Sequence, residues 1–195
     1  MAARTYYAVS KLDLVLLQGG TFAFPTSLYA ALIQATAGYW TASTAYTVGQ
    51  TIVPTSPNGR LYQCTTAGTS AATQPTWPTT DGGTVTDGTA VWTEMTPTFE
   101  AGTITEVSAT STGYARVAVA SNTTNWPNPV NGVIYNGTAI TFPTATASWG
   151  LVFGVALFDA VTAGNLWLFG PLTAPQSVAS GITVQYDTGN LSLTG

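Results

Sequence analysis

The residue types that most often carry catalysis are scarce in this chain. It contains no histidine, which is the commonest general base and a member of the Ser-His-Asp and Cys-His arrangements. Its single cysteine, Cys64, stands in a strand-like segment with Arg60 as its one basic neighbour, which predicts a buried and unreactive thiol. Because one cysteine without histidine builds neither an intrachain disulfide nor a metal cluster, we expect no metal and no cofactor.

Glycoside hydrolysis is a reaction that the remaining residue types still permit, because it needs only two carboxylates. The chain has eight Asp and Glu residues. Asp81 and Asp87 precede glycines in turn-like contexts, whereas Glu94, Glu100 and Glu106 are scattered at the edges of strand-like segments. Turn formation and solubility explain carboxylates in such places, so the sequence predicts a protein that is not an enzyme.

A set of aromatic residues offers a chemistry that needs no ionisable group, because exposed rings can stack on the apolar faces of sugars. The set comprises Trp40, Tyr46, Tyr62, Trp77 and Trp92. The alternative is that these rings form the core of a module that is too small to fold without large apolar side chains. We interpret Tyr62 and Trp92 as core residues and take Trp40, Tyr46 and Trp77 as candidate glycan-binding residues.

The composition limits the kinds of partner. Of the 195 residues, 6% are charged and 45% are hydrophobic, against roughly 25% charged residues in typical soluble domains. So few charges give little protection against association, which indicates assembly with other proteins. Four cations and a net charge of −4 leave no basic patch for nucleic acid. The longest apolar stretch, 149–158, is about half a membrane span, so we expect a soluble chain made in a cytosol, with no membrane partner.

Short strand-like segments separated by turn residues fill most of the chain. They recur at intervals of roughly 8 to 12 residues, which predicts an all-β, antiparallel β-sandwich of jelly-roll type rather than an α/β fold. One short N-terminal helix is expected, because Ser10 to Asp13 has the spacing of a capping box and Gly19-Gly20 supplies a stop. The predicted strands are 51–53, 60–64, 90–93, 102–107, 114–120, 140–142, 150–158, 165–170, 182–186 and 191–193.

The amino-acid composition changes between Trp40 and Glu94, where Thr, Gly and Pro dominate and the apolar residues are mostly aromatic or Val. This change predicts a discontinuous core of residues 1–38 plus 98–195, with a small β domain inserted at 39–97. An insertion is tolerated where its loop faces open space. We therefore expect the module to point away from whatever the core binds.

Several short motifs of the insert share the spacing of a known kind of module. They are Trp40, Ala45-Tyr46, Val48-Gly49, Tyr62 to Cys64, Ala67 to Ser70, Pro75 to Pro78, Thr84 to Gly88 and Val91-Trp92. Together they resemble the small aromatic-rich β modules, akin to chitin-binding carbohydrate modules, that recur in tail and surface proteins of tailed bacteriophages. The resemblance implies a carbohydrate-binding-like domain.

The flanking segments carry a second set of motifs. They are Thr26 to Leu32, Thr105 to Val107, Gly113 to Val117, Asn136-Gly137, Ile140 to Pro143, Trp149-Gly150, Phe158 to Ala160 and Ala163 to Leu166. These segments resemble a family of phage virion structural proteins known as tail-fibre, minor structural or head decoration proteins. In that family the segment like 27–34 is a strand, which is why we expect a strand there although the apolar spacing also fits a helix.

Arg116 is a rare cation in a strand-like run of Tyr, Ala and Val. If its side chain is buried, its charge needs a carboxylate or several carbonyls, and the candidate partners are Glu106 and Asp159. We therefore predict a structural ion pair at this position rather than a ligand site.

These observations lead to one functional hypothesis with one alternative. The first is a capsid decoration protein that binds the major capsid protein through its β-sandwich, associates with itself as a homotrimer, and projects its module outward towards a host or environmental glycan. The alternative is a tail-fibre or receptor-binding protein in which Trp40 and Trp77 recognise a glycan of the host surface. Both place the protein in the virion, on the capsid exterior or on the tail.

Overall fold

The computed structural model describes residues 3–194 and contains two helices and fifteen strands in that range. The helices are α1 (Tyr6–Leu16) and α2 (Thr96–Glu100). The strands are β1 (Ala3–Arg4), β2 (Ser27–Ala35), β3 (Ala45–Tyr46), β4 (Thr51–Ile52), β5 (Tyr62–Thr66), β6 (Gly68–Thr69), β7 (Thr84–Asp87), β8 (Ala90–Glu94), β9 (Val117–Ala120), β10 (Val133–Tyr135), β11 (Ile140–Thr144), β12 (Gly150–Phe158), β13 (Leu166–Val178), β14 (Thr183–Tyr186) and β15 (Ser192–Thr194). All strand pairs are antiparallel, and the predicted all-β, sandwich-like fold is confirmed.

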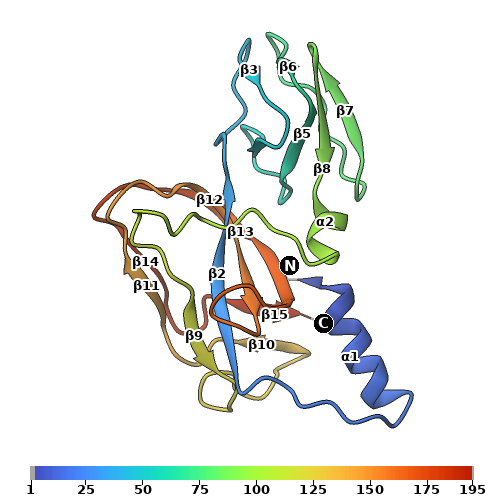
Figure 1. Ribbon diagram of the computed structural model, residues 1–195, viewed down its shortest axis with the longest axis vertical. Helices are drawn as coiled ribbons and strands as arrows, with labels where there is room; N and C mark the ends of the chain where they lie inside the picture. Colours follow the sequence, from blue (N-terminus) through green and yellow to red (C-terminus); the bar gives the residue numbers. More distant parts are fainter. Residues whose placement is uncertain (1–2, 195) are drawn as a thin grey trace.

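A five-stranded sheet with the order β1-β13-β12-β2-β9 forms the centre of the molecule (Figure 1). Its middle strand, β12, is an unbroken apolar run from Leu151 to Phe158, and every residue of that run is buried. A strand of this kind is covered on both faces, and it therefore has to lie between two apolar clusters.

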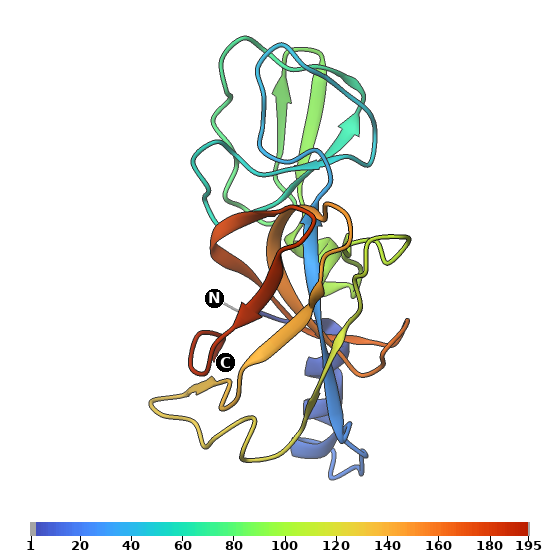
Figure 2. The same cartoon turned by 90° about the vertical axis from the view of Figure 1, so that its left-hand side faces the viewer.

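The two apolar clusters lie on opposite faces of the sheet. Alternate residues of β2 divide between them, since Ala30 and Leu32 belong to one cluster whereas Ala31 and Ile33 belong to the other. The first cluster is closed by the strand pair β11–β14, through Ile140, Phe142 and Val184, and this pair lies to one side of the central sheet (Figure 2). The second is closed by α2 and by residues at the base of the inserted module.

The strand β12 changes its alternation at a bulge next to Gly154. Leu151 and Phe153 face the second cluster, but beyond the bulge Ala156 and Phe158 do so, because the register slips between Val152 and Gly154 against both neighbouring strands. A Cβ atom at Gly154 would lie 2.5 Å from the carbonyl oxygen of Gly170. Glycine is thus required here by the close approach of the neighbouring strand.

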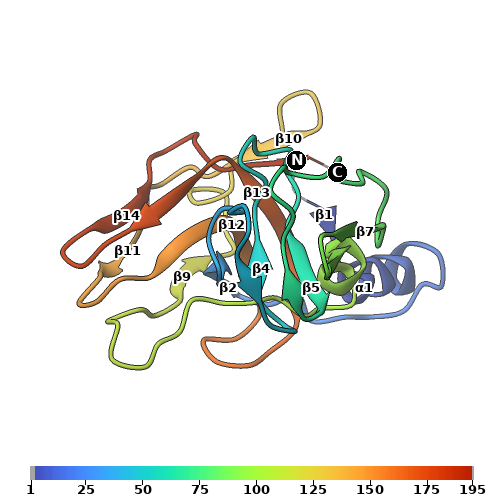
Figure 3. The same cartoon turned by 90° about the horizontal axis from the view of Figure 1, so that it is seen from above.

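The inserted segment forms two sheets of its own, β4-β5-β8-β7 and β3-β6. Figures 1 and 3 show these sheets at one end of the molecule, above the central sheet, with α1 on one side of the core and β11 and β14 on the other. Three apolar residues of the segment, Val53, Leu61 and Met95, join the cluster that also holds Phe99 and Phe153 of the core. The division into a core and an inserted domain at 39–97 stays a prediction. The two parts are connected by apolar contacts as well as by the two segments of backbone that join them.

Three expectations about local structure were wrong. Helix α1 begins at Tyr6 with Thr5 as N-cap, so Ser10 lies inside the helix, where its hydroxyl donates to the carbonyl of Tyr7. The predicted strand 102–107 is reduced to a single bridge between Ile33 and Glu106, beyond the part of β2 that pairs with β9. The predicted strand 114–120 begins only at Val117, and Arg116 precedes it.

We predict that Gly154→Ala lowers the free energy of unfolding by about 1–3 kcal/mol, since the added methyl group has to displace backbone and not a flexible side chain. Urea unfolding followed by circular dichroism measures this change. Ser177→Ala, an exposed substitution on β13, is the control and should stay within about 0.5 kcal/mol of the parent. A Gly154→Ala protein as stable as the control would contradict the close approach of the two strands.

Candidate functional site

The interior of the module is organised around the buried carboxylate of Asp87. The side chain stands at the end of β7, where Gly88 with a φ of +63° allows the tight turn into β8. Its Oδ2 atom accepts hydrogen bonds from the indole N–H groups of Trp40 at 2.7 Å and Trp92 at 3.1 Å, and its Oδ1 accepts from the backbone N–H of Ala71 at 2.8 Å. Three donors satisfy a charge that burial would otherwise penalise.

The three candidate glycan-binding rings belong to this interior. Trp40, Tyr46 and Trp77 are only 7%, 4% and 8% exposed. Tyr46 packs edge-to-face on Trp92 with ring centroids 4.8 Å apart, and Trp77 lies 4.6 Å from the ring of Tyr62. The expectation of exposed rings at these positions is therefore corrected, because a module of this size needs all of its large rings to build a core.

A charged cluster lies at the base of the module, where it meets the core. Glu94 is almost fully buried and accepts hydrogen bonds from the backbone N–H groups of Gly82 and Thr96 and from the hydroxyl of Thr96. The Nη1 atom of Arg60 lies 3.0 Å from Glu94 and 2.7 Å from Asp81, and the hydrogen bond to Asp81 raises the pKa of Arg60. The sequence analysis did not predict this cluster. A signal was available, because Ala90, Trp92 and Glu94 are alternate residues of β8 and therefore share its buried face.

The cluster borders a cleft of about 310 Å³ between the module and the core, which we call the junction cleft. Its module side carries Asn58, Gly59, Arg60, Leu61, Asp81, Glu94 and Thr96, and its core side carries Ala3, Phe99, Phe153, Phe169 and Pro171. Polar groups therefore lie on one wall and aromatic and aliphatic groups mostly on the other. This arrangement is typical of ligand sites between two parts of a chain.

Arg116 is held entirely by structural contacts. Its Nε and Nη2 atoms donate to the two oxygens of Glu106 at 2.9 and 2.7 Å, and its Nη1 donates to the carbonyls of Ala160 and Ala163. The guanidinium lies 3.6 Å from the ring centroid of Phe158. Of the two candidate partners, Glu106 pairs with Arg116, and the pair fastens the loop after β12 to the sheet.

Asp159, the other candidate partner of Arg116, forms no ion pair with it and instead organises a loop. It accepts hydrogen bonds from the backbone N–H and side-chain amide of Asn165 and from the indole of Trp167. Partial burial opposes the charge of the carboxylate, but these hydrogen bonds outweigh it and lower the pKa of Asp159. The carboxylate therefore closes the loop between β12 and β13.

The cysteine and the carboxylates do not form a cluster suited to covalent or metal chemistry in the described part of the chain. Cys64 is buried, and burial raises the pKa of its thiol. Within residues 3–194 no three Cys, Asp or Glu side chains come together in a way that could hold a metal ion. Neither helix of that range is long and apolar enough to cross a membrane.

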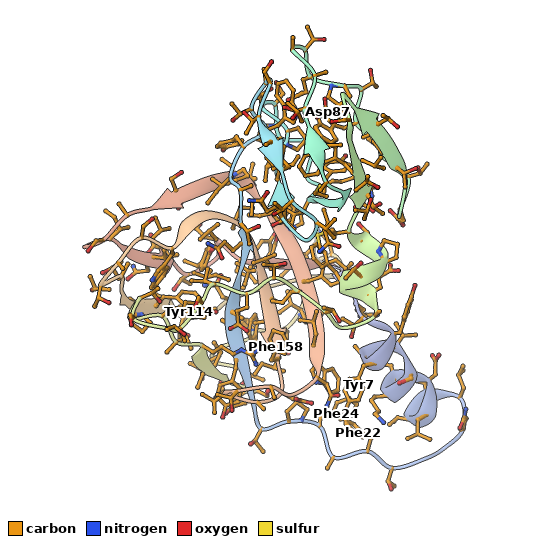
Figure 4. The ribbon with its side chains drawn as sticks, turned by 45° about the horizontal axis from the view of Figure 1, so that its top comes forward. Tyr7, Phe22, Phe24, Asp87, Tyr114 and Phe158 are labelled. Carbon is orange, nitrogen blue, oxygen red and sulfur yellow. The ribbon has the colours of Figure 1, made fainter. Side chains whose placement is uncertain are left out.

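A group of rings on the core lies at the end away from the module, with Phe24 exposed and Tyr7 and Phe22 half-buried. Figure 4 shows Tyr7, Phe22 and Phe24 gathered beside α1, where they surround the edge of Trp167. The C-terminal end of α1 adds Leu16 and the C-cap residue Leu17, which are 75% and 80% exposed. We call this surface the α1 face.

One comparison with known proteins gives a match. Residues 82–194, more than half of the chain, match a family described as podophage GP4 fiber I protein gp80. The matched range begins inside the inserted module, so it includes the hairpin β7–β8 as well as the core after α2. A search of curated proteins found no match.

We predict that Asp87→Ala destabilises the module by about 3 kcal/mol or more, because two indole N–H groups and one backbone N–H lose their buried acceptor. Tryptophan fluorescence during urea unfolding reports the change, since Trp40 and Trp92 lie at the site. Thr86→Ala, next to it and exposed, is the matched control and should behave as the parent. Equal stability of both variants would show that Asp87 does not organise this interior.

Two tyrosines with buried hydroxyl groups should respond differently to the loss of those groups. Tyr114 accepts from the N–H of Leu32 and donates to Glu106, whereas the hydroxyl of Tyr186 is buried without a hydrogen-bond partner in the described chain. We expect Tyr114→Phe to cost about 1–3 kcal/mol at pH 7 and Tyr186→Phe to be near neutral. Urea unfolding of the pair measures the difference, and equal effects would contradict it.

The same pair predicts an alkaline loss of stability. Burial raises the pKa of both tyrosines above the usual value of 10.0. In the unfolded chain they ionise near that value, while in the native protein they stay protonated, so stability is full below pH 10 and falls as the pH rises above it. Tyr186→Phe should reduce the slope by about 1.4 kcal/mol per pH unit. An unchanged slope would mean that Tyr186 ionises freely in the native state.

Proposed function

The chain belongs to the podophage GP4 fiber I protein gp80 family, and on that premise we propose that this bacteriophage virion structural protein is a fibre component of the tail. In this proposal the β core associates with other virion proteins, including further copies of the same chain, and the inserted module faces outward. The observation that carries the proposal is the placement of the module and the α1 face at opposite ends of the molecule.

The α1 face supports attachment at the core end. Leu16 and Leu17 at the end of α1 and Phe24 in the segment that follows are exposed, and exposed apolar side chains are common at protein interfaces. The core around it is strengthened by buried contacts such as that of Thr5, whose hydroxyl donates to the carbonyl of Leu166 at 2.5 Å. A rigid apolar end of this sort suits a permanent contact between virion proteins.

The module supports display at the other end. Its five buried rings and its two buried carboxylates take part in its own packing, and its apolar contacts with the core hold it in one orientation. A capsid decoration protein that binds the major capsid protein is the second candidate, since the same geometry suits a shell protein with an outward module. The family match favours the fibre.

Location in the virion decides between the two candidates. Antibodies raised against the module and imaged on intact virions should label the tail or its fibres, in the copy number of a fibre. Cryo-electron microscopy of the same particles should then place the core density next to the tail. Label spread over the head at the sites where capsomers meet would overturn the fibre proposal and establish the decoration protein.

We further predict that the α1 face is required for assembly. Leu17→Ser should strongly reduce incorporation into virions, because a contact between proteins loses a large apolar side chain. Val48→Ser on the module is the matched control, since Val48 is also exposed, at 65%, but lies at the other end. Quantitative immunoblots of purified particles measure incorporation. Equal incorporation of the two variants would show that attachment does not use the α1 face.

A further inference from the structure

The chain contains three Asn-Gly pairs, which begin at Asn58, Asn131 and Asn136. An asparagine that precedes glycine is open to an intramolecular reaction, because the glycine has no Cβ atom to shield its backbone nitrogen from the side-chain amide. The reaction turns the asparagine into an acidic residue and needs no enzyme or cofactor. The structure gives the three pairs different surroundings, and these decide where the reaction can take place.

Asn136 is buried and held on every side. It is 1% exposed, its Nδ2 donates to two backbone carbonyls at 2.9 Å, and its Oδ1 accepts from the backbone N–H of Leu191 at 2.8 Å. The backbone N–H of Gly137, whose nitrogen would attack, donates to the carbonyl of Asn125 at 2.7 Å. Reaction at Asn136 therefore requires that this buried network opens first.

Asn58 lies at the surface, but both ends of its side-chain amide are bound. Its Nδ2 donates to the hydroxyl of Tyr62 at 2.8 Å, and its Oδ1 accepts from the backbone N–H of Arg60 at 3.1 Å. Tyr62 is buried, and its hydroxyl donates in turn to the carbonyl of Pro78. The Asn58 side chain has to give up both hydrogen bonds before its Cγ atom can reach the nitrogen of Gly59.

Asn131 and Gly132 form the tip of a two-residue turn. Backbone hydrogen bonds of 2.9 and 3.0 Å join Val130 and Val133 on either side of the tip. The φ angles of Asn131 and Gly132 are 51° and 77°, as in the type I′ turns that favour this pair of residues. Both residues are exposed, and neither the Asn131 side chain nor the backbone N–H of Gly132 has a hydrogen-bond partner among residues 3–194.

The tip of this turn is also free of packing contacts. A Cβ atom built at Gly132 would meet no heavy atom of the described residues within 4 Å, and the neighbouring Val130 is 65% exposed. Figures 1 and 2 show the segment before β10 at the end of the molecule away from the module. Water reaches the tip freely, and only the two hydrogen bonds of the turn restrain its local motion.

We propose that Asn131 is a modification site at which the folded chain deamidates spontaneously, whereas Asn58 and Asn136 are protected. The backbone nitrogen of Gly132 attacks Cγ of Asn131, the bond from Cγ to Nδ2 breaks, and the proton of the Gly132 N–H leaves with Nδ2 in ammonia. Water then opens the succinimide ring at either carbonyl carbon, where its hydroxyl group stays, and its other proton returns to the nitrogen of Gly132. The products are aspartate and isoaspartate, and no oxidant or reductant takes part.

The two products affect the turn differently. Each adds one negative charge to a chain whose net charge is −4. Aspartate tolerates a positive φ much as asparagine does, so the turn is kept. Isoaspartate leads the main chain through its Cβ atom and lengthens the turn, so the two hydrogen bonds between Val130 and Val133 no longer form together. The amides of these two valines should then exchange faster with solvent.

Mass spectrometry of the purified full chain tests the proposal. The folded chain and the chain unfolded in urea are kept side by side in a mildly alkaline buffer and then digested with chymotrypsin, since cleavage after Tyr135 puts Asn131 and Asn136 on separate peptides. In the folded chain Asn131 should react at least about tenfold faster than Asn58 and Asn136, because only the other two need a prior opening. In urea the three should react at similar rates.

Two substitutions confirm the site. Asn131→Gly removes the reacting amide and suits a positive φ, so it should abolish deamidation of the folded chain and leave the amide spectrum native elsewhere. Asn128→Ala is the matched control, since Asn128 is an exposed asparagine of the same loop that precedes proline, whose nitrogen carries no proton to lose. This variant should deamidate as the parent does.

Three results would overturn the proposal: a rate at Asn131 no higher than at Asn58 or Asn136 in the folded chain, reaction of Asn131 in urea only, or equal loss of deamidation in Asn131→Gly and Asn128→Ala. The measurement uses the isolated chain and is independent of where the protein lies in the virion. Failure of the modification site and failure of the fibre proposal are therefore observed separately.

Discussion

The double-sided burial of β12 is the constraint on which the rest of the structure depends. A strand without polar residues from Leu151 to Phe158 cannot face water on either side, so each face of the central sheet has to be covered. The pair β11–β14 covers one face, through Ile140, Phe142 and Val184. On the other face α2 and the base of the module do so, through Met95, Phe99 and Leu61. The inserted segment is thereby part of the core's own cover.

This shared cover explains how a module with short strands keeps one orientation. A small β domain that is attached only by two flexible linkers would rotate relative to the core, since few contacts would oppose its motion. Here Val53 and Leu61 are fully buried in the second cluster. These contacts fix the base of the module against the central sheet, and the junction cleft lies beside them.

Buried carboxylates organise the module and its base, where few charges are available. Asp87 collects donors from two tryptophans and one backbone amide, and Glu94 collects donors around the turn at Gly82. Each charge is matched by hydrogen bonds that satisfy it, so these side chains impose a single arrangement on their surroundings. Arg116 does the same for the loop after β12. In a chain with 6% charged residues, most of these ions are thus structural.

The sequence alone determined the class of the fold and much of its strand pattern, because strand-like runs and turn residues are local signals. The limits of β12 were predicted at 150–158, and β2 was expected from the resemblance at Thr26 to Leu32. A pairing of Arg116 with Glu106 was foreseen as one of two options, since a cation in an apolar run needs a counter-charge. The start of α1 was missed because Thr5 rather than Ser10 provides the N-cap.

Only the tertiary structure decided which aromatic rings are exposed and which carboxylates can be reached. Trp40 and Trp77 are of the residue type that stacks on sugars. Both rings are buried nevertheless, because a module of this size needs them to form its apolar core. Arg60 and Asp81 lie 21 positions apart in turns whose sequences indicate nothing of a shared cleft. Exposure and proximity depend on how distant segments pack, and local patterns of residue type do not contain that information.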